Sequence, residues 1–230
     1  MQPPRLISSM ATRQLLAELS AVFAQSGGVP PEVVSVGGVD AAKRVRDGEG
    51  FDEVMLASTA IEQLEQAGAV RVGTRLDVVR SAVAVAVAAG RSAPPLRTGQ
   101  DVLQLLHGAS RIAYSTGPSG THLLQLLHRW GVNEALAGRL VQTPPGVPVA
   151  QWVASGQADV GFQQRSELIG QAGIAVLGDL PPEMAGITTF SMARCSQCRA
   201  DPAVLQAWRS FIVSPSTAEI KRRLGMEPIL

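Results

Sequence analysis

The segment 115–120 is the part of this sequence whose residue types most clearly suggest ligand chemistry. It reads Ser-Thr-Gly-Pro-Ser-Gly and precedes a predicted helix. The first amide groups of a helix have no partner within the helix, and the helix dipole adds partial positive charge, so such a turn can hold an anion. Ser115, Thr116, Ser119 and Gly120 are therefore candidate anion ligands. For this turn alone, ordinary N-capping by Ser119 is the alternative.

A second hydroxyl-bearing turn lies near the start of the chain, where a predicted first strand meets the first helix. It contains Ser8, Ser9 and Thr12, and Ser58 follows the third predicted strand. Ligands of open α/β sheets bind beside the carboxyl ends of parallel strands, so these hydroxyl groups are expected at the same edge. Capping by Ser9 or Thr12 is the alternative. Ser8, Ser9 and Ser58 join the candidate ligands.

Longer polar side chains could complete an anion site. Arg80 precedes the apolar part of a long predicted strand, and its guanidinium could bind a carboxylate through two parallel hydrogen bonds. A solvated surface arginine is an equally good interpretation. Gln163 and Gln164 follow a predicted strand and offer amide donors, either to a ligand or at a helix start.

His122 is the candidate catalytic residue if the protein is an enzyme. With Ser119 as N-cap, His122 is the third residue of its helix, beside the proposed anion. The helix dipole favours the neutral form of a histidine there, so His122 could act as a base. A packed histidine without chemistry is the favoured alternative, and Glu167 is a further candidate base. His107 and His128 fit positions near helix C-termini.

Cys195 and Cys198 are the two cysteines of the chain, separated by two residues. Such a pair could cycle between thiol and disulfide or bind a metal, but two thiols make only half of a zinc site. Unreactive thiols on a loop are the favoured interpretation. No metal is therefore expected. No cofactor is expected either, because the glycine motifs that bind nucleotide phosphates are absent from the sequence.

Length and composition narrow the class of protein. The chain has 230 residues, of which 20 are basic and 19 acidic, and the formal charge of +1 is not concentrated in any block. This argues against a nucleic-acid groove, which needs a clustered basic surface. Hydrophobic residues make up 46% and charged residues 17%, so a sizeable core is expected and long disorder is not. The apolar stretch 82–89 is much shorter than the roughly 20 residues that span a bilayer.

Strands rich in β-branched residues alternate with amphipathic helices along the whole chain. This alternation predicts an α/β protein with largely parallel sheets covered on both faces. The predicted strands are 5–9, 32–36, 53–58, 78–89, 111–114, 139–142, 158–162, 174–177 and 187–194. The predicted helices are 11–25, 39–46, 59–67, 100–107, 119–130, 147–154, 163–170, 202–212 and 215–224.

Six short segments carry a resemblance to a known family. They are Ile-Ser-Ser-Met at 7–10, Ala-Ser at 57–58, Arg-Ser-Ala-Val-Ala-Val-Ala-Val at 80–87, Ala-Tyr-Ser-Thr-Gly-Pro-Ser-Gly at 113–120, Gly-Phe-Gln-Gln at 161–164 and Ile-Thr-Thr-Phe-Ser at 187–191. In this order and spacing they resemble the type II, periplasmic-type solute-binding proteins, in the branch of the molybdate-binding proteins. The resemblance covers nearly the whole chain.

The resemblance implies a two-lobed type II periplasmic-binding-protein-like fold. Two mostly parallel sheets would be joined by two crossover hinge strands, 78–89 and 187–194. Lobe one would comprise residues 1–82 and 191–230, and lobe two residues 83–190. A small anion would lie in the cleft between the lobes.

Three functions remain open at this stage. The first is binding of a small anion, an oxyanion or a carboxylate, as the substrate-binding component of an ABC transporter. The second is an isomerase that acts on a tricarboxylate such as aconitate by proton transfer, because the same fold branch includes such an enzyme. The third is the sensor domain of a transcription regulator, which ranks last because no helix-turn-helix pattern is visible. Whether the protein is an enzyme is left open.

The location follows from the same observations. No signal peptide is visible in the sequence, so a cytoplasmic protein is expected as the sequence stands, and a periplasmic one if a leader has been removed. An ABC permease would be a partner if the protein is exported. No membrane span and no nucleic-acid partner are expected.

Overall fold

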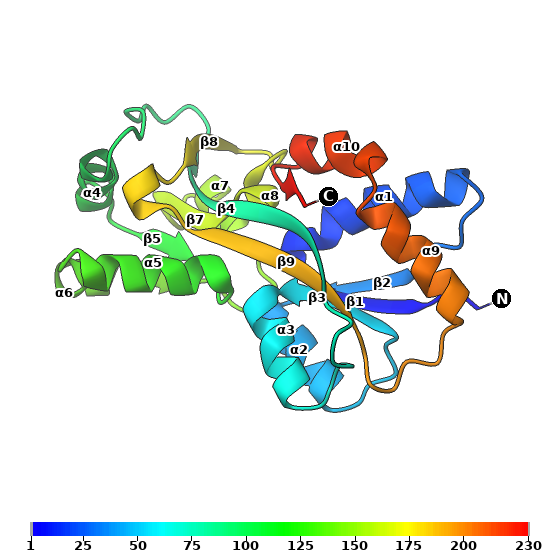
Figure 1. Ribbon diagram of the computed structural model, residues 1–230. Coiled ribbons are helices and arrows are strands. Elements are labelled where there is room, and N and C mark those ends of the chain that lie inside the picture. Colours follow the sequence, from blue (N-terminus) through cyan, green and yellow to red (C-terminus); the bar gives the residue numbers. More distant parts are fainter. Residues whose placement is uncertain (1, 230) are drawn as a thin grey trace. The chain divides into compact units, whose positions relative to one another are not determined.

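The computed structural model describes residues 2–229 and divides them into two compact units (Figure 1). Unit 1 contains the chain up to Ser81 and again from Thr189, and unit 2 contains Ala82–Thr188. The chain passes from unit 1 to unit 2 within β4 (Leu76–Ala88) and returns within β9 (Ile187–Arg194). The boundaries predicted from the sequence fall within these same two strands.

Unit 1 is built on three parallel strands in the order β2-β1-β3, and β9 pairs with β3 in the antiparallel direction. The short β10 pairs with β4. The elements of this unit are β1 (Arg5–Ser9), η1 (Met10–Thr12), α1 (Arg13–Gln25), β2 (Glu32–Val36), α2 (Gly38–Arg46), β3 (Glu53–Ala57), α3 (Ser58–Gln66), α9 (Pro202–Ile212), η4 (Pro215–Thr217), α10 (Ala218–Arg223) and β10 (Glu227–Pro228).

Alternating side chains of β1 show how this sheet is covered on both faces. Leu6 packs in a cluster with residues of α1 and α9, whereas Ile7 packs with residues of α2 and α3. Successive side chains of a strand point to opposite faces, and both are apolar here, which is the pattern of a strand buried on both sides. Helices α2 and α3 lie together on one side of the sheet in Figure 1, and α1 and α9 on the other.

Unit 2 repeats the plan with the parallel strands β6-β5-β7, and both β7 and β8 pair with β4 in the antiparallel direction. Its elements are α4 (Gly99–His107), β5 (Ile112–Tyr114), α5 (Pro118–Arg129), α6 (Asn133–Leu136), η2 (Ala137–Arg139), β6 (Leu140–Gln142), α7 (Val149–Ala154), β7 (Val160–Gln164), α8 (Arg165–Leu168), β8 (Ile174–Asp179) and η3 (Pro182–Met184).

The Val-Ala alternation in β4 sets the thickness of the layers in unit 2. Val83, Val85 and Val87 face the large core that contains residues of α4 and α5. The alanines between them face α7 and α8, and on the same face Gly161 of β7 is in contact with Val149. A Cβ at Gly161 would lie 2.5 Å from a methyl carbon of Val149, so α7 packs directly on the backbone of β7.

Several predicted boundaries need correction. Gln163 and Gln164 belong to β7 and do not begin a helix, and the helix that follows has only the four residues of α8. The predicted helix 11–25 is divided into η1 and α1, and 215–224 into η4 and α10. The pattern did not predict α6 or β10. None of the described helices has the length and apolar character needed to cross a bilayer.

Candidate functional site

In unit 1, the three parallel strands end at one edge, and hydroxyl groups gather there. Ser8 and Ser9 end β1, where Ser8 is level with Ser35 of β2, and the two Oγ atoms are 2.8 Å apart. Ser58 follows β3 as the first residue of α3 and is half-buried. The parallel register therefore brings hydroxyl groups from all three strand ends to this edge, which we call the unit 1 edge. Ser35 was not predicted, although its place near the end of a strand at this edge was a usable signal.

Ser9 is the most distinctive residue of the unit 1 edge. Its side chain is only 8% exposed, and its Oγ has no hydrogen-bond partner among the described residues. It flanks η1 with extended backbone but makes no side-chain capping bond, and Thr12 also makes none, donating instead to the Ser9 carbonyl oxygen at 3.2 Å. The capping alternative for these two residues is therefore wrong. A buried hydroxyl without a partner is costly unless a ligand or water satisfies it.

In unit 2, the corresponding edge carries the 115–120 turn between β5 and α5. Helix α5 begins at Pro118, so its N-cap is Gly117, which has no side chain to cap the helix. The predicted capping by Ser119 is therefore wrong. Ser119 is completely buried in the first turn of the helix, and its Oγ lies 3.0 Å from that of Ser115. The Gly117 N–H donates to Ser115 Oγ at 3.2 Å, and Thr116 is half-buried beside it. We call this the unit 2 edge.

Gly120 is required by the close approach of this turn to its helix. A Cβ at this position would lie 1.8 Å from the carbonyl oxygen of Ser115, which is far inside any permitted contact. Any larger residue would therefore displace the turn that holds Ser115 and Ser119.

Gln163 and Glu167 add an amide and a carboxyl group to the unit 2 edge. Because β5 and β7 are parallel with Tyr114 level with Phe162, Gln163 near the end of β7 is level with Ser115, the first residue after β5. Gln163 is buried; its Oε1 accepts from the Val149 N–H at 3.0 Å, and its Nε2 donates to Glu167 Oε1 at 2.8 Å.

Glu167 is half-buried, and burial raises its pKa to about 7, although the amide of Gln163 partly offsets the rise. This carboxyl group can therefore exchange a proton near neutral pH. Gln164 is also buried; its Nε2 donates to Thr188 Oγ1 at 2.8 Å, and its Oε1 has no partner among the described residues.

His122 occupies a different place from the one predicted. Because α5 begins at Pro118, His122 is the fifth residue of the helix and lies beyond its first turn. Its Nε2 is 2.9 Å from the Met184 carbonyl oxygen and therefore donates to it. The ring also packs against Gly186, where a Cβ would lie 2.4 Å from it. This geometry agrees with the packed histidine that was the favoured alternative.

Two cations of unit 1 differ sharply in their surroundings. Arg80, the predicted counter-charge, is exposed on β4 opposite Glu227 of β10. Lys221 in α10 is completely buried, its Nζ has no partner among the described residues, and burial lowers its pKa to about 8. Lys221 was not predicted from the sequence; the available signal was its spacing of three residues from Ala218 and from Leu224, which are both buried.

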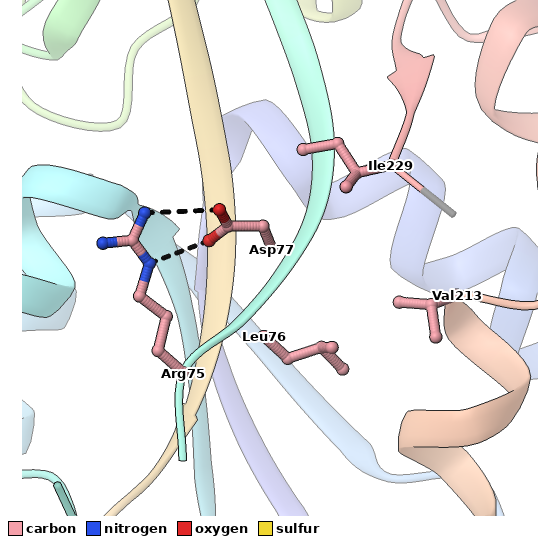
Figure 2. Close-up of a pocket in the computed structure, with 5 residues that line it drawn as sticks. All are labelled: Arg75, Leu76, Asp77, Val213 and Ile229. Atoms are coloured by element: carbon pink, nitrogen blue, oxygen red, sulfur yellow. Dashed lines mark hydrogen bonds and ion pairs between the residues drawn. The ribbon is translucent and has the colours of Figure 1, made fainter. Parts of the chain in front are cut away.

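A cavity of about 440 Å³ lies elsewhere in unit 1, lined by Arg75, Leu76, Asp77, Val213 and Ile229 (Figure 2). Figure 2 shows Arg75 and Asp77 joined by two hydrogen bonds, the shorter being 2.8 Å, and Arg75 also pairs with Glu62 at 2.6 Å. The positive charge of this cavity is thus already neutralised within the protein. Among residues 2–229, no group of three or more His, Cys, Asp or Glu is placed to hold a metal ion.

Comparison with known sequences gives a family and a relative for the chain. The family model described as bacterial extracellular solute-binding protein matches residues 4–227. The aconitate isomerase of a Pseudomonas species is 27% identical over 230 residues, which cover 97% of this chain and 87% of that protein.

Solved structures with the same fold include anion-binding proteins. The periplasmic molybdate-binding protein of Azotobacter vinelandii superposes with a TM-score of 0.80 at 20% identity and covers 99% of both chains. The sulfate-binding protein SubI of Mycobacterium tuberculosis gives a TM-score of 0.77 at 17% identity, over 100% of this chain and 88% of that one. At these identities the likeness shows a shared fold, that of the type II periplasmic binding proteins.

Proposed function

Because this chain belongs to the family of bacterial extracellular solute-binding proteins, we propose that it binds a small anion, either an oxyanion or a carboxylate. The donors would be the hydroxyl and amide groups of the unit 1 edge and the unit 2 edge. These comprise the predicted ligands Ser8, Ser9, Ser58, Ser115, Thr116, Ser119, Gly120 and Gln163, with Arg80 as an outlying counter-charge.

The observation that carries this proposal is the buried, unpartnered hydroxyl of Ser9 at the carboxyl end of a parallel strand. An anion would satisfy this hydroxyl. The partly buried pair of Ser115 and Ser119 would supply the same chemistry in unit 2. The molybdate- and sulfate-binding names of proteins with this fold are further support for an oxyanion.

The test is a thermal-shift screen followed by calorimetry. The protein is dialysed extensively to remove bound solutes and is then mixed with molybdate, tungstate, sulfate, phosphate and a series of di- and tricarboxylates. A ligand at 100 times its Kd stabilises the folded state by about 2.7 kcal/mol, a clear shift in Tm. The proposal fails if none of these anions changes Tm or gives a heat of binding.

Matched variants test the donor assignment. Ser9→Ala and Ser119→Ala should each weaken the same ligand, whereas Ser210→Ala and Ser92→Ala, at exposed positions in unit 1 and unit 2, should leave its Kd unchanged. If both pairs behave alike, the edges are not the binding surface.

Isomerisation of a tricarboxylate is the second candidate function, favoured by the relative at 27% identity and by Glu167. A carboxyl group with a pKa near 7 can take a proton from one carbon of a substrate and return it to another as the double bond moves. Glu167 fits this role better than the predicted base His122, whose Nε2 is held by the Met184 carbonyl oxygen.

Turnover separates the two candidates. Trans-aconitate is mixed with the protein in deuterated water, and proton NMR follows formation of the cis isomer and uptake of deuterium. Turnover that Glu167→Gln abolishes while binding persists would establish the enzyme. Binding without turnover leaves the solute-binding function alone.

The family also suggests where the protein acts and with what. An extracellular solute-binding protein delivers its ligand to a membrane permease, so the proposed partner is an ABC permease and the proposed location is outside the cytoplasm. Fractionation of the native host, with immunoblots of the periplasmic and cytoplasmic fractions, tests this. Recovery in the cytoplasmic fraction alone would contradict it and would favour the isomerase.

A further inference from the structure

Cys195 and Cys198 stand at the two ends of one tight turn that directly follows β9. The Cys198 N–H donates to the Cys195 carbonyl oxygen at 3.1 Å, the hydrogen bond that closes a β-turn. The Cα atoms at the ends of such a turn are less than about 7 Å apart, and disulfides bridge Cα separations of about 4.4–6.8 Å. Both thiols are free. We infer that these two cysteines are the site of an intramolecular disulfide that closes this turn.

The first half of the turn is fixed by backbone hydrogen bonds to two other segments of unit 1. The Cys195 N–H donates to the Asp52 carbonyl oxygen at 2.9 Å, and the Ser196 N–H donates to the Ala69 carbonyl oxygen at 3.0 Å. Cys195 also forms an isolated antiparallel bridge with Val70. The position of the Cys195 Cα atom is therefore set before any bond between the sulfurs forms.

The second half of the turn is fixed by charged side chains. The Asp52 carboxylate accepts from the N–H groups of Arg199 and Ala200, both at 2.9 Å. The Arg71 guanidinium donates to the Cys198 carbonyl oxygen at 3.1 Å. With both ends anchored, closing the disulfide would fix few further backbone dihedral angles, so little conformational entropy would be lost.

The two thiols are expected to react in a fixed order during oxidation, because they differ in exposure. Cys195 is 4% exposed and Cys198 is half-buried, so a small-molecule disulfide meets Cys198 first. The Cys198 thiolate attacks the reagent, forms a mixed disulfide and expels one thiolate. Cys195 then attacks the Cys198 sulfur and expels the second thiolate. The pair loses two electrons and two protons, and the reagent is reduced to two thiols.

The closure is expected to be slow at neutral pH. Burial raises the pKa of Cys195 to about 12 and also raises the pKa of Cys198, so few thiolates are present. The pair is therefore expected to form its disulfide slowly and not to cycle rapidly as a catalytic pair. This inference goes beyond the interpretation of unreactive thiols, and it rests on the turn alone, independently of anion binding.

Mass spectrometry after oxidation tests the inference. The folded protein is incubated with excess oxidised glutathione at pH 8.5, alkylated and digested with trypsin. Because Arg194 and Arg199 flank the pair, one peptide, 195–199, carries both cysteines. The expected product is this peptide lighter by two hydrogen atoms and without an alkyl group. A persistent glutathione adduct on Cys198, or two alkylated cysteines, would overturn the inference.

Variants and melting curves provide the second readout. Cys195→Ser should stop at the mixed disulfide on Cys198, which supports the assigned order. Closing so short a loop should raise Tm of the wild type by about 2–4 °C over its reduced form, with no change in Cys195→Ser/Cys198→Ser. An equal Tm response to oxidant in the double variant would show that the stabilisation lies elsewhere and would count against the site.

Discussion

The unit 1 edge and the unit 2 edge share one plan but differ in packing and in chemistry. In unit 2, Gly120 stands so close to the preceding turn that a Cβ would lie 1.8 Å from the Ser115 carbonyl oxygen. In unit 1, a Cβ at Gly38, the first residue of α2, would lie 3.7 Å from the Cβ of Ser9, an ordinary contact. The turn of unit 2 is therefore packed tightly against its helix. In unit 1, the space between Gly38 and Ser9 would accommodate an added methyl group.

The chemical difference concerns titration. The ligand candidates of the unit 1 edge are hydroxyl groups, whose protonation does not change in the physiological range. The unit 2 edge adds Glu167, with a pKa of about 7. In the proposed site, the hydroxyl groups of the unit 1 edge would give affinity that is independent of pH, whereas Glu167 would make binding at the unit 2 edge depend on pH.

The largest expected effect comes from Gly120→Ala compared with Gly38→Ala. Gly120→Ala should destabilise the protein by about 1–3 kcal/mol, because the overlap forces the turn to move, and it should abolish measurable anion binding. Gly38→Ala should change stability by less than about 0.5 kcal/mol and leave Kd within a few-fold. Urea unfolding and calorimetry measure both. Similar losses of stability and of affinity in the two variants would contradict the proposed difference in packing.

Glu167→Gln should change the pH dependence of stability. The folded state holds the Glu167 proton up to about pH 7, whereas an unfolded glutamate loses it near pH 4.3. The folded state thus binds more protons in this window, and wild-type stability should fall as pH rises through it and level off above pH 7.

The variant keeps an acceptor for the Gln163 amide but lacks the charge, so it should match the wild type at pH 4 and be more stable by about 1–2 kcal/mol at pH 8. Thermal unfolding across this range measures the difference. Because the two proteins are otherwise identical, the comparison cancels other titrating groups such as Glu53, whose pKa burial also raises. A constant difference at all pH values would contradict the assignment.

Ser119→Ala and Ser9→Ala should each weaken anion binding about tenfold, corresponding to the loss of one hydrogen bond. Their stabilities should differ. Ser119→Ala removes the contact with Ser115 and should cost about 1 kcal/mol, whereas Ser9→Ala removes a buried hydroxyl without a partner and should cost nothing. Calorimetry and unfolding of the ligand-free proteins separate these outcomes, and a clear stability loss in Ser9→Ala would show a partner for this hydroxyl.

Arg80→Ala should have the smallest effect. The side chain is exposed, so its attraction for an anion is screened by water and salt. Kd should rise two- to fivefold at low ionic strength and by less at 0.5 M salt. A loss that persists at high salt would instead indicate direct contact with the ligand.

The strand ends were predictable because a strand and its last residue are local features. Apolar runs predicted β1 and β3, and the hydroxyl residues at or just after their ends were assigned to one sheet edge from the parallel pattern alone. The family resemblance then supplied the division of the chain, which no local pattern contains.

Other features depend on contacts that are distant in the sequence. Gln163 and Gln164 extend β7 because their amides find partners at Val149 and Thr188, so two polar residues are buried where the pattern predicted a helix start. The N-cap of α5 lies two residues earlier than expected because Pro118 is well suited to the first helical position.

The two crossings of the chain have a consequence for its synthesis. Unit 2 is one continuous stretch that a ribosome completes before the last part of unit 1 emerges. Until then, β3 lacks its neighbour β9, and the α1 face lacks Trp208 and Ile212 of α9. In the nascent chain, β3 therefore remains an unpaired edge strand while more than a hundred further residues are synthesised. We expect chaperones that bind unpaired strands to associate with the chain during translation.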